Sequence, residues 1–541
     1  MRNGSTVSLW LGGAARRRGI RSGESREGDR EPEAGGPASF LILSVFLSLF
    51  CISLKAGADG KSLLILTGDL VKERSAKLDQ FVAAKEARGF TVKVATESDY
   101  GAEGLAGQDR GLAIRAWLKN AAKDYRFLLI IADADPDYGD VPFLKVWPRH
   151  QFPEGQCAQF PIDCRSCVTD FLYAEITGDW DLNRNGQLGE TELDDGPGGI
   201  EFESELMVGR IPVYFGEIDD VDVILAKTIA YMSQTQDQVA YRSRILLPAA
   251  FFYFRGQPMI TKDDDGAAIT EWFVRHALDG MPGITYTRLY EAEGVVPSAY
   301  DFERPLTEEN LVDEWSKGYG MVFWAGHGLE KQVARTFWAS DDNANDKADG
   351  DEVQQPLFIQ SSDTANLPND QPAFVVGVSC EIGSVEVPEN LSWSLLAKGG
   401  AIGVIGSSSV TPGTLTDYAG DAADLDAANY GADNMGIVFF SSLIEGKTAG
   451  EAFFETKKTL GTAGGVEPYA GKLMLNYFGD PSLTLYDTAD DAKPVEDAGT
   501  PDSGAGGSEA RNEGSSGGCS VAGVGKTSRS LTVLDLYDLA I

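Results

Sequence analysis

Short apolar runs alternate with amphipathic segments along most of this chain. Strand-like runs stand at residues 62–67, 90–95 and 127–132, and helical patterns at 73–88 and 111–125 separate them. The runs are almost continuously apolar, as expected for strands that are buried on both faces of a sheet. Strand–helix alternation of this kind predicts an α/β fold with a mostly parallel sheet.

The same alternation covers the rest of the region that the pattern predicts to be folded. A strand at 206–212 and a helix at 217–233 follow a loop-rich insert at about 135–203. A second α/β run begins at 244–248. It contains further strands at 284–290, 321–328, 373–380 and 399–407 and helices at 266–279, 308–317, 390–398, 434–443 and 449–461. We therefore expect two packed subdomains, at 59–238 and 239–488.

The two ends of the chain differ in composition from this region. An uncharged apolar run at 40–54 precedes Ala56-Gly57-Ala58, a small-residue site of the kind that signal peptidase cleaves. We expect residues 1–58 to be a leader and signal peptide (signal at 40–58), and the mature protein to be secreted or at the cell surface. The run is short for a membrane span, so no stable insertion is expected after cleavage. The Gly/Ser/Pro-rich tail at 489–541 is expected to be disordered.

The net charge narrows the range of partners. The 541 residues include 46 basic and 82 acidic ones, which gives a formal charge of −36. A chain this acidic is not expected to bind nucleic acid without a local basic patch, and none is evident. An acidic excess favours solubility and can supply calcium ligands.

Two of the apolar runs end on a reactive residue. The run at 321–328 ends in His327-Gly328, and the run at 373–380 ends in Cys380. Open α/β sheets place their active sites at the carboxyl ends of strands. A Cys and a His held there form a nucleophile–base pair, so the first hypothesis is a cysteine hydrolase that acts on peptide bonds. Taken alone, Cys380 would instead be an inert core cysteine, because free Cys is among the most buried residue types.

Other groups complete this hypothetical site. The backbone N–H groups of Gly328 and Cys380 are candidates for an oxyanion hole. A carboxylate could orient His327, and Glu205 is the candidate because it precedes the strand at 206–212. An ordinary salt-bridging residue at the strand end is the alternative for Glu205.

An acidic loop in the insert has the spacing of a calcium site. Residues 181–192 fit the pattern Asp-x-Asn-x-Asn-Gly-x5-Glu, with oxygen ligands at fixed positions. The expected ligands are Asp181, Asn183, Asn185, the backbone carbonyl of Gln187, and Glu192. We expect a structural calcium ion here; an acidic surface turn is the alternative. A second acidic stretch at 341–351 is a weaker candidate.

Three cysteines cluster in the same insert. Cys157, Cys164 and Cys167 favour a local disulfide in an exported protein. Zinc is the less favoured reading, because His150 is the only other ligand nearby. Three cysteines leave one unpaired, so the connectivity stays open.

Several stretches together resemble the gingipain family of caspase-like cysteine peptidases. They are the His-Gly and Ser-Cys blocks, Glu-Leu-Met-Val-Gly-Arg-Ile-Pro-Val at 205–213, Gly-Gly-Ala-Ile-Gly-Val-Ile-Gly-Ser at 399–407, and Asn-Tyr-Phe-Gly-Asp-Pro-Ser-Leu at 476–483. The resemblance spans about residues 60–488. It implies a caspase-like three-layer α/β sandwich and an endopeptidase that cleaves protein or peptide substrates after basic residues, with no organic cofactor.

Two other functions remain open on the sequence. One is a non-catalytic, calcium-stabilised surface or adhesion protein built on a peptidase fold, against which the intact Cys380 and His327 argue. The other is a different thiol hydrolase, such as an amidase or transpeptidase, which uses similar chemistry.

Overall fold

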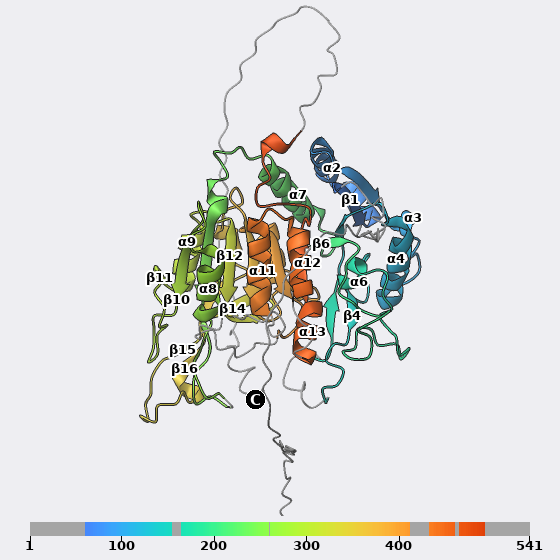
Figure 1. Ribbon diagram of the computed structural model, residues 1–541. Coiled ribbons are helices and arrows are strands. Elements are labelled where there is room, and N and C mark those ends of the chain that lie inside the picture. Colours follow the sequence, from blue (N-terminus) through green and yellow to red (C-terminus); the bar gives the residue numbers. More distant parts are fainter. Residues whose placement is uncertain (1–59, 154–163, 259, 412–431, 460–464, 493–541) are drawn as a thin grey trace, which may run out of the picture. The chain divides into compact units, whose positions relative to one another are not determined.

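Eleven strands from both halves of the chain form one sheet in the computed structural model, which describes residues 60–153, 164–258, 260–411, 432–459 and 465–492 (Figure 1). In spatial order they are β11 (Arg304–Pro305), β10 (Thr285–Tyr290), β7 (Arg244–Ala249), β12 (Met321–Ala325), β18 (Ala373–Val378), β19 (Ala401–Ser407), β20 (Leu475–Gly479), β6 (Met207–Pro212), β3 (Phe127–Ala132), β1 (Ser62–Thr67) and β2 (Thr91–Ala95). The sheet is mostly parallel, and β19 and β20 run antiparallel. One sheet thus spans both expected subdomains.

The strands of the first half show why their sequences are continuously apolar. Every residue of β1 and β3 is buried. In β1, Leu63 and Ile65 belong to one hydrophobic cluster, whereas Leu64 and Leu66 belong to another. Successive side chains of a strand point to opposite faces, so a sheet covered on both faces needs apolar residues at every position.

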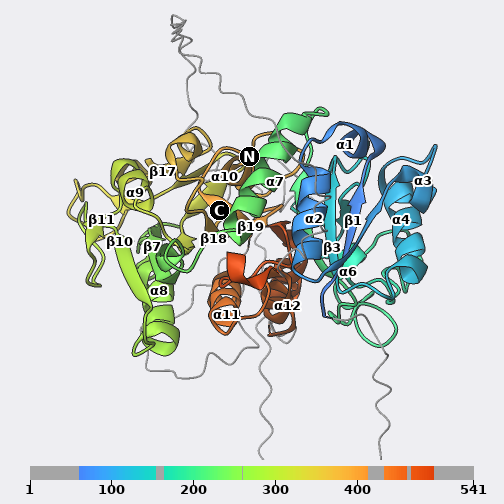
Figure 2. The same ribbon diagram turned by 90° about the horizontal axis from the view of Figure 1, so that it is seen from above.

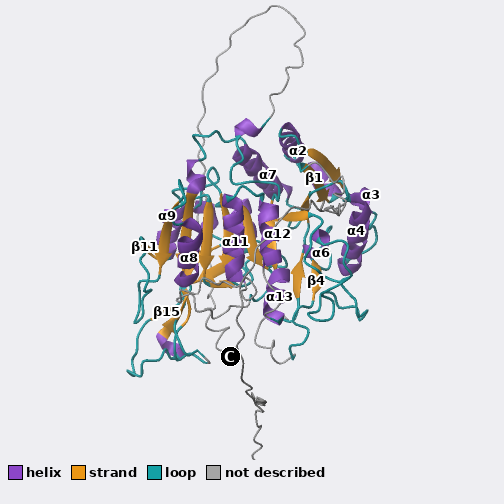
Figure 3. Cartoon of the chain, in the orientation of Figure 1, coloured by secondary structure: helices purple, strands orange, loops and turns teal. Residues whose placement is uncertain are grey.

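Helices cover both faces of this sheet and make it the middle of three layers (Figures 2 and 3). One layer contains α2 (Leu78–Ala87), α7 (Ile218–Met232), α9 (Glu308–Trp315) and α10 (Leu391–Ala397). The other contains α4 (Gly107–Ala121), α8 (Ala267–Phe273), α11 (Ala432–Ile444) and α12 (Ala449–Thr459). The predicted α/β class with a mostly parallel sheet and helices on both faces is therefore confirmed.

The helix expected at 73–88 is interrupted. The structure has α1 (Asp69–Arg74) and then α2, with a break at Ser75. The Asp222 carboxylate of α7 accepts hydrogen bonds from the Ser75 hydroxyl and from the backbone N–H of Ala76, at 2.9 Å for the latter. A carboxylate from a distant helix thus binds the backbone N–H groups of Ala76 and Lys77, which a continuous helix would have used, and sequence periodicity cannot reveal it.

Residues of two stretches that carry the family resemblance, 205–213 and 476–483, anchor the insert to the sheet. Arg210 of β6 is fully buried and donates through Nε and Nη2 to the Asp170 carboxylate, at 2.7 and 2.6 Å. Asn476 of β20 accepts from the Asp170 backbone N–H at 3.1 Å and from the Thr169 hydroxyl at 3.2 Å. These residues therefore satisfy buried polar groups, which would be costly to leave unpaired.

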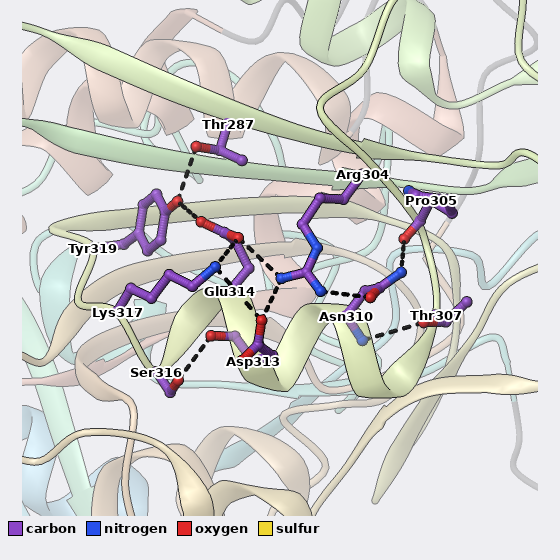
Figure 4. A network of polar contacts seen from close by, with 10 residues as sticks. All are labelled: Thr287, Arg304, Pro305, Thr307, Asn310, Asp313, Glu314, Ser316, Lys317 and Tyr319. Carbon is purple, nitrogen blue, oxygen red and sulfur yellow. Dashed lines mark hydrogen bonds and ion pairs between the residues drawn. The ribbon is translucent and has the colours of Figure 1, made fainter.

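A polar network holds α9 against the sheet (Figure 4). The Thr307 hydroxyl caps the helix by accepting from the Asn310 backbone N–H at 3.2 Å. The Glu314 carboxylate accepts from Tyr319, just before β12, at 2.6 Å and from Arg304 of β11 at 3.1 Å. The helix is thereby tied to the entry of one strand and to the edge of the sheet.

Some predictions concern segments outside the described residues. The signal peptide at 40–58 is one of them, as are Cys157 and nearly all of the tail at 489–541. Within the described ranges, no helix is long and apolar enough to cross a membrane. Cys164 is disulfide-bonded, in agreement with the predicted disulfide, and Cys167 is a buried free thiol.

The contact between β6 and β20 generates a stability prediction. A Cβ atom on Gly209 would lie 2.4 Å from the Gly479 carbonyl oxygen, so Gly209→Ala should force the strands apart and cost about 1–3 kcal/mol. In α13 (Val466–Met474), a Cβ atom on Gly471 would meet nothing within 4 Å. Gly471→Ala is the matched control and should instead stabilise by about 0.5–1 kcal/mol. Thermal unfolding of both variants tests this, and an equal effect would contradict the close approach.

Candidate active site

Three neighbouring strands end at the same level and deliver the candidate site. Ala325 of β12 pairs with Ala249 of β7 on one side and with Val378 of β18 on the other. All three strands are parallel, so the residues that follow them emerge at one edge of the sheet. His327 lies two residues after Ala325, and Cys380 lies two residues after Val378. The structure therefore brings the two predicted reactive residues to the same edge.

His327 is held by the segment that follows β7. The ring is buried, with 6% of its surface exposed, and its Nε2 lies 2.8 Å from the Phe252 carbonyl oxygen. A carbonyl only accepts hydrogen bonds, so Nε2 carries the proton of the neutral ring and Nδ1 keeps a lone pair. Burial lowers the pKa of His327, and the bond to Phe252 opposes this shift. The neutral form can therefore act as a base.

Cys380 is partly exposed at the same edge of the sheet. Its Sγ accepts a hydrogen bond from the Thr411 backbone N–H at 3.4 Å. Tyr253 links the two residues: its ring lies 5.5 Å from the His327 ring, between centroids and edge to face. Burial and then the charge of the Cys380 thiolate raise the pKa of the Tyr253 phenol to about 12. A single tyrosine thus lies close to both reactive residues.

Gly328 makes the contact between the segment that follows β12 and the segment that follows β18. The strand-like run expected at 321–328 is broken at Gly326, and His327 and Gly328 belong to β13 (His327–Leu329) of a separate three-stranded sheet. A Cβ atom on Gly328 would lie 2.3 Å from the Cys380 carbonyl oxygen and 2.9 Å from its nitrogen. Only glycine fits at this position, so its backbone lies directly against that of Cys380.

The structure does not bring Glu205 to His327. One Glu205 oxygen accepts from the Ile176 backbone N–H at 2.8 Å, and the other accepts from the Thr177 hydroxyl. These residues directly follow α6 (Phe171–Ala174), in the insert of the first half. Glu205 therefore fixes a turn through hydrogen bonds, which neither the predicted role nor the salt-bridging alternative described. At His327, the backbone carbonyl of Phe252 occupies the position that a carboxylate was expected to fill.

Glu381, which the sequence analysis missed, lies directly after Cys380. Its side chain is only 2% exposed, its φ of 55° is in the left-handed region, and its Oε1 has no hydrogen-bond partner. Burial, reinforced by the charges of Glu330 and Glu386, raises the pKa of Glu381 to about 7. Backbone strain and a lone buried carboxyl group next to a reactive residue are typical of functional sites. In the sequence, the signal was a charged residue at the end of an apolar strand.

The acidic loop at 181–192 folds as an Asx-rich turn. The Asp181 carboxylate accepts from the backbone N–H groups of Asn185 and Gly186, at 2.9 and 3.1 Å. The Asn185 side-chain oxygen accepts from the Gln187 N–H at 2.8 Å. The side-chain oxygens of Asp181, Asn183 and Asn185 therefore accept from backbone N–H groups of one short turn, and their role as calcium ligands stays a prediction.

Glu190 lies where Glu192 was expected to close the loop, and the predicted set of calcium ligands stays a prediction. Glu192 is exposed and has a φ of 68°, whereas the carboxylate that faces the loop belongs to Glu190. Glu190 accepts from the side-chain amides of Asn183 and Asn185 at 2.8 and 2.7 Å. The turn at Gly189 (φ 72°) shifts the register by two residues, which the fixed spacing of the motif could not show.

The second acidic stretch adopts the same turn. Asp341 accepts from the backbone N–H groups of Asn345 and Asp346 at 3.0 and 3.1 Å, and Asn345 accepts from the Lys347 N–H at 2.8 Å. Within the part of the chain that the structure describes, no group of three or more His, Cys, Asp or Glu side chains is placed to hold a metal ion. Asparagine and backbone oxygens would have to supply part of any coordination shell.

The fold is that of a caspase-like α/β protein, and comparisons with known proteins identify its family. The model of peptidase family C25 matches residues 57–486. Because this match covers most of the chain, the chain belongs to that family and is a gingipain-like, caspase-fold cysteine peptidase. A comparison with curated proteins gives no match.

Solved structures with the same fold include two of gingipain. The crystal structure of the Arg-specific cysteine proteinase gingipain R is 14% identical, with a TM-score of 0.53 over 80% of this chain and 79% of that chain. A complex of the pro- and mature domains of RgpB from Porphyromonas gingivalis is 14% identical, with a TM-score of 0.51 over 79% of this chain and 80% of that chain. A third structure, described as a protease, is 15% identical, with a TM-score of 0.50 over 80% of both chains. At this identity the likeness concerns the fold alone.

The buried Glu381 carboxyl group predicts a pH dependence of stability. Its pKa rises from 4.5 to about 7 on folding, so its contribution to stability is complete below pH 4.5 and is lost as the pH rises through about 7. Glu381→Gln removes the charge, and its stability relative to wild type should increase from about pH 5 to about pH 8, by on the order of 1–3 kcal/mol. Thermal unfolding at both pH values measures this, with the exposed Glu73→Gln as control. A pH-independent difference for Glu381→Gln would contradict the shifted pKa.

Proposed function

We propose that this protein is a secreted endopeptidase that hydrolyses peptide bonds through Cys380 and His327. The observation that carries the proposal is the common level of β7, β12 and β18, which puts both residues and the Phe252 carbonyl at one edge. Nδ1 of His327 first takes the proton of the Cys380 thiol. The thiolate then attacks the peptide carbonyl and forms a thioester, the C–N bond breaks, and the proton passes from Nδ1 to the leaving amine. Water, deprotonated by the same nitrogen, then hydrolyses the thioester and restores the thiol.

Backbone groups assist this reaction in the proposal. The tetrahedral intermediate carries a negative charge on oxygen, which preorganised N–H groups stabilise. Gly328 and Cys380 are the proposed donors, and the contact between their backbones supports this assignment. Phe252 holds the His327 ring in the tautomer that leaves Nδ1 for proton transfer.

We infer a preference for cleavage after basic residues from carboxylates near Cys380. Asp264 pairs with Tyr253 across the short ladder of β8 (Phe251–Tyr253) and β9 (Asp264–Asp265). Burial raises the pKa of Asp264 to about 6, and its carboxylate makes no hydrogen bond with another described side chain or backbone group. The charge of Lys262 opposes this rise, and a basic substrate side chain would stabilise the carboxylate further.

Secretion is supported by the disulfide at Cys164. Stable disulfides are typical of oxidising compartments and rare in the cytosol. Together with the apolar run before Ala58, this supports export of the mature protein.

We also propose that calcium stabilises the loop at 181–194. Its donors are carboxylate, amide and backbone oxygens, the ligand types that calcium prefers. Asp181, Asn183, Asn185, the Gln187 carbonyl and Glu190 would hold the ion. Bound calcium would fix the loop by favouring its folded form through mass action.

Peptide cleavage tests the peptidase proposal. Protein beginning at Asp59, with and without calcium, is incubated with an unbiased peptide library. Cys380→Ala removes the nucleophile, so turnover should fall by at least about 10³-fold, whereas Cys167→Ala, at the other described free thiol, should leave it intact. Cuts after Arg or Lys that Asp264→Asn weakens would support the basic preference. Full activity in Cys380→Ala would refute the nucleophile assignment.

Hydrogen exchange tests the calcium proposal and its ligand register. We expect calcium to slow exchange in peptides that cover 181–194, and Glu190→Gln to weaken this protection by about tenfold in calcium concentration. Glu192→Gln is the matched control and should behave like wild type, because Glu192 points away from the loop. If Glu192→Gln loses the protection and Glu190→Gln keeps it, Glu192 is the closing ligand as first expected. If calcium protects nothing in wild type, calcium binding at this loop is refuted.

A further inference from the structure

We propose that Arg149, in the insert of the first half, is a positioning residue for Cys380. It fixes the short segment at 408–411, which follows β19 and whose backbone contacts the nucleophile from the side away from β12. The inference rests on the proposed function of Cys380 and adds a residue that the sequence analysis did not consider.

Arg149 is buried where three parts of the chain meet. Only 3% of its surface is exposed. Its Nη1 donates to the Val410 carbonyl at 3.0 Å and to the carbonyl of the disulfide-bonded Cys164 at 3.3 Å. Its Nε and Nη2 donate to one oxygen of Glu467, in α13, at 3.0 and 2.7 Å. A planar guanidinium can serve these acceptors at once, and a lysine cannot.

The segment that Arg149 holds surrounds the nucleophile with hydrogen bonds. The Thr411 N–H donates to the Cys380 sulfur at 3.4 Å, and the Thr411 hydroxyl donates to the Ser379 carbonyl at 3.4 Å. The Ser409 carbonyl accepts from the Glu381 N–H at 3.2 Å. The segment therefore contacts the residue before Cys380, the thiol itself and the residue after it.

This arrangement affects the reactive form of the cysteine. The thiolate is the nucleophile, and the Thr411 N–H that donates to the sulfur favours it. The Thr411 carbonyl oxygen, 3.8 Å from the sulfur, accepts from the thiol and favours that form, so the balance depends on how Thr411 is held. Without Arg149 the Val410 carbonyl would lose its charge-assisted hydrogen bond, and the adjacent Thr411 N–H would lose its fixed position. The consequence should be a smaller thiolate fraction at neutral pH, in addition to any loss of stability.

A purely structural role is the competing explanation, because Arg149 also joins the insert to α13. The two explanations differ in the pH dependence of Cys380 reactivity. A structural role lowers the unfolding temperature and leaves the thiol reactivity of the folded protein unchanged. A positioning role moves the pH at which Cys380 reacts at half its maximal rate.

The test is the rate of Cys380 alkylation by iodoacetamide as a function of pH, with the modified residue identified by mass spectrometry. In the full chain, Arg149→Ala should raise the midpoint by about one pH unit, which is about a tenfold loss of thiolate at neutral pH. Arg149→Lys keeps the positive charge and should raise the midpoint less than Arg149→Ala does. Arg242→Ala is the matched control: Arg242 is also buried and donates to the Leu485 and Tyr231 carbonyls, so its loss should lower stability without moving the midpoint.

The outcomes separate this inference from the proposed function. An unchanged midpoint in folded Arg149→Ala overturns the inference, and if that variant does not fold, an unchanged midpoint in Arg149→Lys overturns it instead. If wild type cleaves no peptide but Arg149→Ala shifts the midpoint, the peptidase proposal is refuted and the positioning role is upheld. If wild type cleaves peptides and Arg149→Ala leaves the midpoint unchanged, the peptidase proposal is upheld and the positioning role is refuted.

Discussion

The shared register of β7, β12 and β18 is the constraint on which the candidate site depends. Ala249, Ala325 and Val378 are direct neighbours across the sheet, so a shift of one strand by one residue would turn its side chains to the opposite face. Both faces of the sheet are buried, so such a shift would put side chains of the wrong size into close-packed layers, which makes the register stable. The positions of His327 and Cys380 follow from this register and from the two residues that each chain adds beyond its strand.

Buried polar groups complete what the strands begin. The Phe252 carbonyl fixes the His327 ring, and Arg149 fixes the segment beside Cys380. Each of these groups is satisfied by a partner far away in the sequence or in another element. Because an unpaired buried polar group costs about 1–3 kcal/mol, the hydrogen-bond network holds the reactive residues more firmly than apolar packing alone would. Glu381 is the exception, with one carboxyl oxygen left without a partner next to the nucleophile.

Local patterns predicted most elements of the fold well. The strands at 62–67 and 127–132 match β1 and β3, because a strand that is buried on both faces leaves an unbroken apolar run. The helix at 73–88 was placed as one element, because the capture of Ser75 by Asp222 involves a residue far along the chain. The turn at 181–190 was recognised from its spacing, but the spacing did not show that Glu190 accepts hydrogen bonds from Asn183 and Asn185.

The sequence by itself determined the α/β class, the two strand ends that carry His327 and Cys380, and the Asx-rich turn at 181–190. These features depend on contacts that are local or on strand burial, which leaves a periodic trace in the residues. The tertiary structure alone decided the partners of the site: the Phe252 carbonyl at His327, the Thr411 N–H at Cys380, and Arg149 behind it. Two of these partners act through backbone atoms, which every residue type carries, and all three come from segments distant in the chain. Only folding brings such groups together, so no pattern of residues in the sequence predicts them.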